Sequence, residues 1–307
     1  MRAAVFAYSN VGDRCLRVLR ARGVEVPLVV THRDRPGETI WFDRVADTAA
    51  ELGLATVFAD DASDPVLADA VAAAGPDVIF SFYFRALLPD AILRSASIGA
   101  FNMHGSLLPR YRGRAPTNWA VLHGESETGA TLHVMVAKAD AGAIVDQQAV
   151  PILPDDTALQ VFAKVTVAAE QVLWRSLPSI VAGTVALRPN EIEYGSYFGG
   201  RRPEDGRIDW AQPAARVYNL IRAVAPPYPG AFTELHGVSL VVAKAKRAAP
   251  AAGEAALRPG LHVVADEIVG VCGDGGRIAI HELRARGELV TPTTLRALLA
   301  RANQAPP

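Results

Sequence analysis

Asn102 and His104 stand two positions apart at the end of an apolar run, within the stretch "FNMHGSLLPRYRGRAP" (101–116). Residues two apart on a strand point to the same side, so both side chains can serve one small polar centre. An amide can donate a fixed hydrogen bond, and an imidazole can carry a proton. The pair therefore suits attack on a carbonyl carbon, where an oxyanion forms and the nucleophile loses a proton.

The nucleophile of such a reaction has no obvious source in the chain, because the sequence holds no G-x-S-x-G motif. We therefore expect a second substrate to supply it. A histidine base is helped by an orienting carboxylate, and Asp140 in "AKADAG" (137–142) is the best candidate, although a turn aspartate is the structural alternative. The loop arginines are either solvated charges or ligands for a phosphate or carboxylate: Arg110, Arg112 and Arg114.

The elements that must position these residues alternate between short apolar runs and amphipathic segments. Strands are expected at 3–8, 24–30, 55–58, 77–82 and 98–104, and helices at 11–22, 40–52 and 65–74. Continuous apolar strands alternating with helices predict a parallel sheet that is covered on both faces. Ligands of open α/β sheets bind outside the carboxyl ends of the strands, and the Asn–His pair stands at such an end.

The second half of the chain changes character. Two strand-like runs (130–136 and 143–152) and a long helix (156–180) are followed by a segment rich in Gly, Pro and charge, and then by short β-like runs. Such runs, broken by turn residues, favour a small barrel. We predict an N-terminal α/β domain over 1–188, a linker over 189–204 and a C-terminal β-barrel domain over 205–307.

Composition excludes several classes of protein. The 307 residues carry a net charge of −1, which gives no reason to expect a nucleic-acid partner or membrane insertion. The first strand is followed by "YSNVGDRCL" with one glycine, so an NAD site is not expected. Neither H-E-x-x-H nor C-x-x-C occurs, and no metal is expected. The N-terminus lacks the pattern of a signal peptide, which predicts a cytoplasmic protein.

The stretch 101–142 resembles the core of the formyltransferases that use 10-formyltetrahydrofolate. Their shared pattern, N-x-H-x-S-L-L-P-x-x-x-G with a later D-x-G, is met here by Asn102, His104, Ser106–Pro109, Gly113, Asp140 and Gly142. The resemblance implies a Rossmann-like N-terminal domain with a mostly parallel sheet and a small OB-like C-terminal barrel. It also implies that Asn102 and His104 stabilise the oxyanion, that His104 exchanges protons with the attacking amine and the leaving folate nitrogen, and that Asp140 supports His104.

Within this family the chain looks most similar to the ArnA subfamily, which formylates UDP-4-amino-4-deoxy-L-arabinose for lipid A modification and polymyxin resistance. The closer likeness lies in "FSFYFRALLPD" (80–90), "YRGRAPTNWA" (111–120), "SYFGGRRPEDGRIDW" (196–210) and "PYPGAF" (227–232). It implies a nucleotide-sugar acceptor and folate co-substrate, and it leaves open a separate dehydrogenase partner or a homo-oligomer. It carries over as folate contacts Ala86, Leu87, Leu88, Arg114, Val136, Ala137, Lys138 and Ala139, and as sugar contacts Asn118 and Arg201.

The sequence departs from the subfamily pattern at two places, and three alternative functions stay open. The subfamily commonly has "YYRH" where this chain has "YFRA", so Phe84 and Ala86 remove two polar groups near the expected folate pocket, and "GGRRP" replaces "GRRTP". A methionyl-tRNA formyltransferase would need a basic face, yet residues 205–307 hold only twelve Lys/Arg against nine Asp/Glu. A different nucleotide-linked amino sugar is a second alternative. A catalytically silent folate- or nucleotide-binding protein is the third, and the complete Asn–His–Asp set argues against it.

Overall fold

The computed structural model describes residues 1–35, 37–249 and 257–302, and its contacts divide the chain into two compact units. Unit 1 comprises Met1–Thr117, Glu127–Pro151 and Phe162–Gly199, and unit 2 comprises Asn118–Ser126, Ile152–Val161 and the chain from Gly200 onward. The division at Gly200 falls inside the expected linker, while two internal segments that we assigned to the N-terminal domain group with unit 2. The predicted domain limits stay a prediction.

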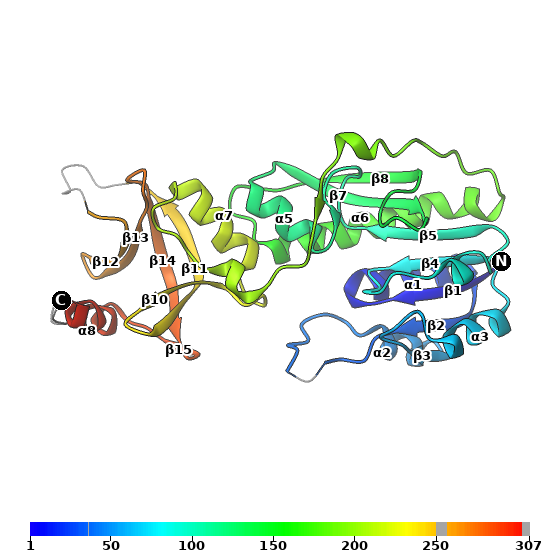
Figure 1. Cartoon of the computed structure of the whole chain (residues 1–307), viewed down its shortest axis with the longest axis horizontal. Helices are drawn as coiled ribbons and strands as arrows, with labels where there is room; N and C mark the ends of the chain where they lie inside the picture. The colour runs from blue at the N-terminus through cyan, green and yellow to red at the C-terminus, as the bar shows by residue number, and fades with distance from the viewer. Residues whose placement is uncertain (36, 250–256, 303–307) are drawn as a thin grey trace. The chain divides into compact units, whose positions relative to one another are not determined.

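Unit 1 is built on a seven-stranded sheet with the order β3-β2-β1-β4-β5-β7-β8 (Figure 1). Its strands are β1 (Arg2–Ala7), β2 (Glu25–Thr31), β3 (Thr56–Phe58), β4 (Val78–Phe82), β5 (Gly99–His104), β7 (Glu127–Val134) and β8 (Ile144–Pro151). The first five pair in parallel, and β7 and β8 join in antiparallel fashion. The carboxyl ends of β1, β4 and β5 therefore share one edge of the sheet.

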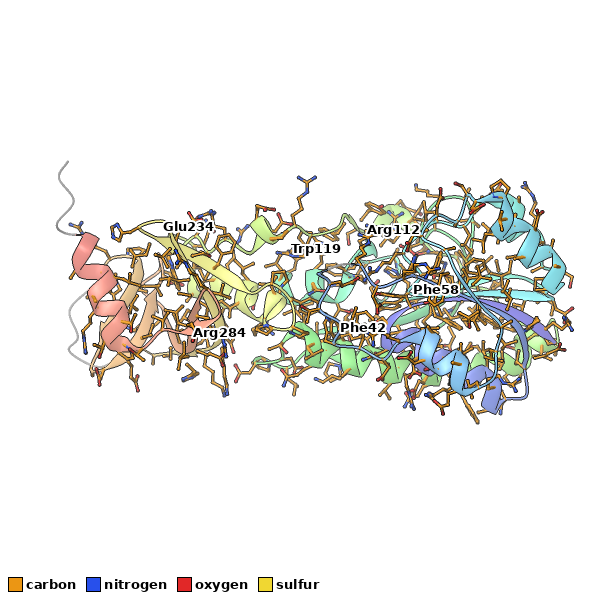
Figure 2. The ribbon with its side chains drawn as sticks, turned by 90° about the horizontal axis from the view of Figure 1, so that it is seen from below. Phe42, Phe58, Arg112, Trp119, Glu234 and Arg284 are labelled. Atoms are coloured by element: carbon orange, nitrogen blue, oxygen red, sulfur yellow. The ribbon has the colours of Figure 1, made fainter. Side chains whose placement is uncertain are left out.

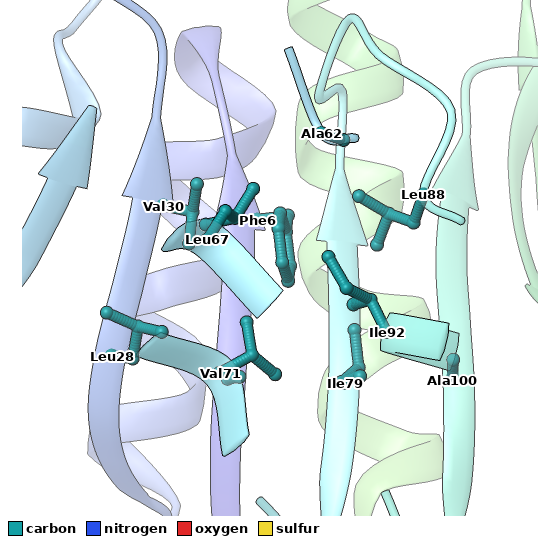
Figure 3. Packing of buried hydrophobic residues seen from close by; sticks show 11 residues of the cluster. Phe6, Leu28, Val30, Ala62, Leu67, Val71, Ile79, Leu88, Ile92 and Ala100 are labelled. Carbon is teal, nitrogen blue, oxygen red and sulfur yellow. The ribbon is translucent and has the colours of Figure 1, made fainter. Parts of the chain in front are cut away.

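Helices cover both faces of this sheet. On one face, α3 (Pro65–Ala74) and α4 (Asp90–Leu93) pack on alternate residues of the strands, and α1 (Ser9–Ala21) and α6 (Ala158–Val181) lie behind the sheet (Figure 3). Eleven buried residues form the core on the α3/α4 face: Ala4, Phe6, Leu28, Val30, Ala62, Leu67, Val71, Ile79, Leu88, Ile92 and Ala100. Strands buried on both faces are almost entirely apolar, as β1 and β4 are here.

Local sequence explains where the helices begin and end. Helix α3 begins after Asp64, whose carboxylate accepts the Val66 N–H, and it ends at Gly75 in the left-handed conformation. The helix expected from Ile40 instead begins at Val45 (α2, Val45–Glu51). Trp41 and Phe42 remain outside it because they pack on the core: the Phe42 ring lies 5.0 Å from the Tyr8 ring (Figure 2).

Unit 2 contains a six-stranded antiparallel sheet with the order β10-β11-β14-β13-β12, with β15 on β14. Its elements are α7 (Ala214–Val224), β10 (Ala231–Leu235), β11 (Val238–Ala248), β12 (Gly260–Val264), β13 (Glu267–Val271), β14 (Arg277–Ala285), β15 (Glu288–Leu289) and α8 (Pro292–Ala302). This sheet is a half-barrel, so the predicted fold class, α/β with a separate small β domain, is confirmed.

The remaining elements of the described chain are short. They are α5 (Pro116–His123), β6 (Arg112–Gly113), η1 (Ile192–Tyr194), β9 (Tyr197–Phe198) and η2 (Pro203–Gly206). Strands β6 and β9 pair in parallel, so part of the expected linker folds onto the loop that follows β5. Across the ranges that the structure describes, no helix is both long and apolar enough to cross a membrane.

Candidate active site

Asn102 and His104 occupy alternate positions of β5, on the same face of the sheet as Ala100 in the α3/α4 core. His104 is the last residue of the strand, and only 6% of it is exposed. The core ends at this point, so the two polar side chains continue an otherwise apolar row toward the edge where ligands bind in open α/β sheets. This placement confirms the expected position of the pair at a strand's carboxyl end.

Asp140 reaches the same place from the loop between β7 and β8. Its Oδ1 atom lies 3.5 Å from His104 Nδ1, and its Oδ2 atom accepts a 2.8 Å hydrogen bond from Gly113 N–H. The backbone of Asp140 is left-handed (φ 51°), a conformation that Asp adopts more readily than most residues. Two positions later, Gly142 has no room for a Cβ beside the Val134 carbonyl. The structure therefore brings together all three predicted catalytic residues.

The environment of Asp140 keeps its carboxyl group ionised. Burial alone would raise the pKa of Asp140, but the neighbouring His104 and His133 rings and the hydrogen bond from Gly113 N–H outweigh burial and hold that pKa well below its usual range. A carboxylate that stays negative stabilises a protonated imidazole beside it. Asp140 can thus favour the charged form of His104 when that ring takes up a proton.

The hydrogen bonds of His104 identify the nitrogen that can exchange a proton. Its Nε2 atom lies 2.8 Å from the Tyr111 carbonyl oxygen. Because a carbonyl oxygen can only accept, Nε2 carries a hydrogen and donates it. Nδ1, which faces Asp140, is therefore the atom that gains or loses a proton.

His133 is a fourth member of this group that the sequence did not reveal. It lies directly opposite Asn102 across the β5–β7 pair, and its Nδ1–H donates to the Val134 carbonyl at 2.8 Å. In the neutral ring Nε2 is then an acceptor, 3.1 Å from Asn102 Nδ2 and 3.5 Å from Asp140 Oδ1. This contact with His133 fixes the orientation of the Asn102 amide group. One N–H of that amide points to His133, and the direction of the second N–H is thereby fixed as well.

Residues of the expected linker brace the loop after His104. Tyr111 N–H donates to Ser196 Oγ at 2.9 Å, and Asn190 Nδ2 donates to the carbonyls of Asp140 and Gly142, each at 3.0 Å. Segment 189–199 is therefore part of unit 1 and supports the backbone on both sides of the Asp140 carboxylate.

The three loop arginines differ in exposure. Arg112 is only 9% exposed, and its guanidinium lies 5.9 Å from the Tyr197 ring, so its interpretation as a solvated loop charge is wrong (Figure 2). Arg110 is exposed. Arg114 is exposed as well, and it donates to the Arg85 carbonyl at 3.0 Å.

Seven of the eight residues expected to contact folate lie on two loops, 83–88 and 136–140, and Arg114 lies on the loop that follows β5. Leu87 and Val136 are exposed apolar side chains, at 73% and 46%, while Leu88 is buried in the α3/α4 core. Ala137 and Lys138 are exposed, and Ala139 is partly buried. The loop that follows β5 connects these two loops by hydrogen bonds. Arg114 donates to the Arg85 carbonyl in loop 83–88, and Gly113 N–H donates to the Asp140 carboxylate in loop 136–140.

Phe84 and Ala86, the two departures in "YFRA", both pack against the α3/α4 core. The Phe84 ring meets the Phe6 ring edge-on at 5.3 Å and stacks on the His32 ring at 4.1 Å. Their apolar character therefore serves packing beneath the loop.

The two expected sugar contacts belong to unit 2. Asn118 is 8% exposed, and its Nδ2 donates to the Ala223 carbonyl at 2.8 Å. Arg201 lies with its guanidinium 4.8 Å from the centre of the Trp119 ring, and burial lowers the pKa of Arg201. Trp119 in turn lies 5.7 Å from the His123 ring. Their roles as substrate contacts stay predictions.

No group of three or more His, Cys, Asp or Glu side chains among the described residues is arranged to hold a metal ion.

Two family models match the chain. The formyl transferase model matches residues 1–177, and the model of the formyl transferase C-terminal domain matches residues 201–295. Together they cover most of both units.

Solved structures of similar fold include three N-formyltransferases. One, from Helicobacter canadensis, is in complex with folinic acid and dTDP-3-aminofucose; it shares 18% identity at a TM-score of 0.71, over 91% of this chain and 98% of that one. WlaRD, a sugar 3N-formyl transferase in the presence of dTDP and 5-N-formyl-THF, shares 18% identity at a TM-score of 0.72, over 94% of this chain and 99% of that one. A 4-N formyltransferase from Francisella tularensis shares 19% identity at a TM-score of 0.65, over 79% of this chain and 96% of that one.

Proposed function

The chain belongs to the formyl transferase family, and from this premise we propose that it transfers a formyl group from 10-formyltetrahydrofolate to the amino group of a nucleotide-linked sugar. The favoured acceptor is UDP-4-amino-4-deoxy-L-arabinose, formylated on its 4-amino group. The amine nitrogen bonds to the formyl carbon, the bond from that carbon to folate N10 breaks, and one proton passes from the amine to N10.

The observation that carries this proposal is the shared position of Asp140 between His104 Nδ1 and His133 Nε2, each 3.5 Å from its Oδ1. Asn102, turned by His133, donates its remaining N–H to the oxyanion of the tetrahedral intermediate. His104 Nδ1 accepts the amine proton and returns it to N10, while Asp140 stabilises the charged ring between the two transfers. One set of side chains thus serves both halves of the reaction.

The linked loops support folate as the donor. Leu87 and Val136 expose apolar surface that an aromatic ligand can cover. Backbone groups of 86–88 and 136–139 are available to a pterin because the side chains of Ala86 and Leu88 pack into the core. Arg114 adds a cation for the folate carboxylates. The neighbouring solved structures obtained with folinic acid and with 5-N-formyl-THF agree with this assignment.

The choice of acceptor rests on the likeness to other proteins and on Arg201. The two neighbours of highest TM-score named above act on 3-amino sugars or bind one, and the third is a 4-N formyltransferase. The 4-amino position is favoured by the ArnA-like stretches 111–120 and 196–210. Arg201 stacked on Trp119 offers a guanidinium and an aromatic face to a nucleotide diphosphate.

The test is a formylation assay with 10-formyltetrahydrofolate and three acceptors: UDP-4-amino-4-deoxy-L-arabinose, a dTDP-linked amino sugar and methionyl-tRNA. We expect product with the UDP sugar. Product with the dTDP sugar alone would show that the acceptor is a dTDP-linked sugar and would leave the proposed reaction type unchanged. Product with methionyl-tRNA alone would overturn the proposal, and no product with any acceptor, together with folate binding, would favour the silent binding protein.

A further inference from the structure

His32 is a buried histidine outside the catalytic set, and all of its polar contacts are made. It follows β2, its side chain is 4% exposed, and its ring stacks on Phe84 at 15° between planes. Nδ1 lies 3.1 Å from Asp60 Oδ1, and Nε2 lies 2.9 Å from the backbone nitrogen of Arg85. One ring thus connects the segments that follow β2, β3 and β4.

The two partners fix the tautomer of this ring. A backbone N–H can only donate, so Nε2 must be an unprotonated acceptor for Arg85. Nδ1 then carries the hydrogen and donates it to the Asp60 carboxylate. A protonated ring would carry a hydrogen on Nε2 and could not accept the Arg85 N–H.

Arg85 is the residue through which the 83–88 loop is held from several sides. Its carbonyl accepts from Arg114, its guanidinium forms an ion pair with Glu38, and that guanidinium lies 4.2 Å from the Tyr8 ring centre. The carbonyl has the exposed Arg114 as its partner and the guanidinium has the partly buried Glu38, but the N–H has only the buried His32 ring. Losing that acceptor would leave a donor without a partner in a part-buried place, which costs more than losing an exposed hydrogen bond.

We propose that His32 is a positioning residue for folate: its Nε2 lone pair fixes the Arg85 backbone and thereby the loop that carries Ala86, Leu87 and Leu88. The proposal rests on the proposed function, since it assumes that this loop contacts folate. His32 acts through the loop and touches neither the formyl group nor the acceptor. Its loss therefore weakens folate binding and leaves the chemical step nearly unchanged.

Several charged groups face this ring from the elements around it. Asp60 and Arg85 contact it directly, Glu38 pairs with Arg85, and a small cavity lined by Tyr8, His32, Asp34, Arg44 and Asp47 lies beside it. Burial lowers the pKa of His32; Asp60 opposes this shift, and Arg85 adds to it. Neutral His32 is therefore the form present at pH 7, and folate affinity falls only as the ring protonates in more acidic solution.

Three variants separate the acceptor from the bulk of the ring. His32→Phe keeps the stacking on Phe84 and removes the acceptor. His32→Gln offers an oxygen near the position of Nε2, and His32→Asn places its oxygen near Nδ1, away from Arg85. His32 can be matched with the exposed strand histidine His281, and His281→Phe is the control.

The probes are 5-formyltetrahydrofolate, which cannot transfer its formyl group, for the dissociation constant, and 10-formyltetrahydrofolate for turnover. For His32→Phe we expect about a tenfold weaker Kd, a similar rise in the folate KM, and kcat within about threefold of wild type. Arg85 amide hydrogen exchange accelerates without any ligand. His32→Gln lies closer to wild type than His32→Asn, and its Kd no longer weakens at acidic pH as that of wild type does.

Two different failures can be told apart. Wild-type Kd and Arg85 exchange in His32→Phe and His32→Asn would overturn the role of His32 and leave the proposed function standing. Wild-type protein that binds no 5-formyltetrahydrofolate would overturn the proposed function and with it the folate role. If His32→Phe fails to fold, the comparison of Gln with Asn decides, and equal Kd values for these two would refute the acceptor argument.

Discussion

Asp140→Asn is the most direct test of the catalytic set, because it removes a charge and changes the shape of the side chain very little. The asparagine oxygen can still accept from Gly113 N–H, as Asp140 Oδ2 does at 2.8 Å. The other end of the amide then faces His104 and His133 without a negative charge. In the proposed mechanism, the protonated form of His104 carries the amine proton between the two halves of the reaction, and this form loses its stabilising partner.

The size of this loss follows from the distance between the charges. Two unit charges 3.5 Å apart, as Asp140 Oδ1 and His104 Nδ1 are, attract by about 5 kcal/mol at an effective dielectric constant of about 20. Each tenfold change in rate corresponds to about 1.4 kcal/mol. The amide dipole and nearby water recover part of the attraction, so we expect kcat to fall by about a thousandfold.

The assay measures tetrahydrofolate release at saturating concentrations of both substrates. Asp146→Asn, on β8 and paired with Arg175 on α6, is the matched control and should keep kcat close to wild type. Binding of 5-formyltetrahydrofolate and urea unfolding establish that the Asp140→Asn protein is folded. A kcat within tenfold of wild type would refute the electrostatic argument.

Four further outcomes are expected. Asn102→Ala lowers kcat by about 10²–10³-fold, as loss of an oxyanion donor does, with folate Kd unchanged; a larger effect on Kd would assign Asn102 to binding. Asn190→Ala leaves two carbonyls without their donor and lowers the free energy of unfolding by about 1–3 kcal/mol in urea titrations. Arg201→Ala raises the acceptor KM by about tenfold without changing the folate KM, as two-substrate kinetics will report. Because folding lowers the pKa of His32, the unfolded state takes up that proton first, so the unfolding free energy declines as pH falls below about 6.5; His32→Gln should flatten this decline.

The sequence predicted the elements of unit 1 well wherever apolar runs and caps were both present. Helix α3 has the predicted bounds because Asp64, Pro65 and Gly75 mark its ends. Helix α2 was predicted five residues too early, because Trp41 and Phe42 fit an amphipathic pattern although tertiary packing holds them outside the helix. A local pattern cannot separate these two uses of an aromatic residue.

The proximity of Asn102, His104 and Asp140 was predictable because two of them share one strand and a known motif, and the third precedes a glycine in a motif of its own; their catalytic roles stay a prediction. The place of His133 beside Asn102 was not predictable, because it depends on the register of the β5–β7 pair, and pairing between strands about 30 residues apart leaves no local mark. Its apolar setting in "ATLHVMV" is that of any buried strand residue. The sequence gives one sign: His133 and Thr131 lie two positions apart on β7 and therefore point to the same face of the sheet.

The contribution of residues 189–199 was missed for a related reason. A segment rich in Gly, Pro and charge is typical of a linker, and nothing in its composition predicts that Asn190 and Ser196 bond the backbone of two catalytic loops. Apart from the two-residue strand β6, these loops have no regular secondary structure of their own, so their carbonyls and N–H groups must find partners elsewhere. A catalytic carboxylate held at φ 51° between Gly113 and Asn190 requires such partners, and a polar segment without apolar periodicity is well suited to supply them. The same argument makes the ordinary-looking polar residues of this segment better candidates for catalytic support than the conspicuous arginines of the loop itself.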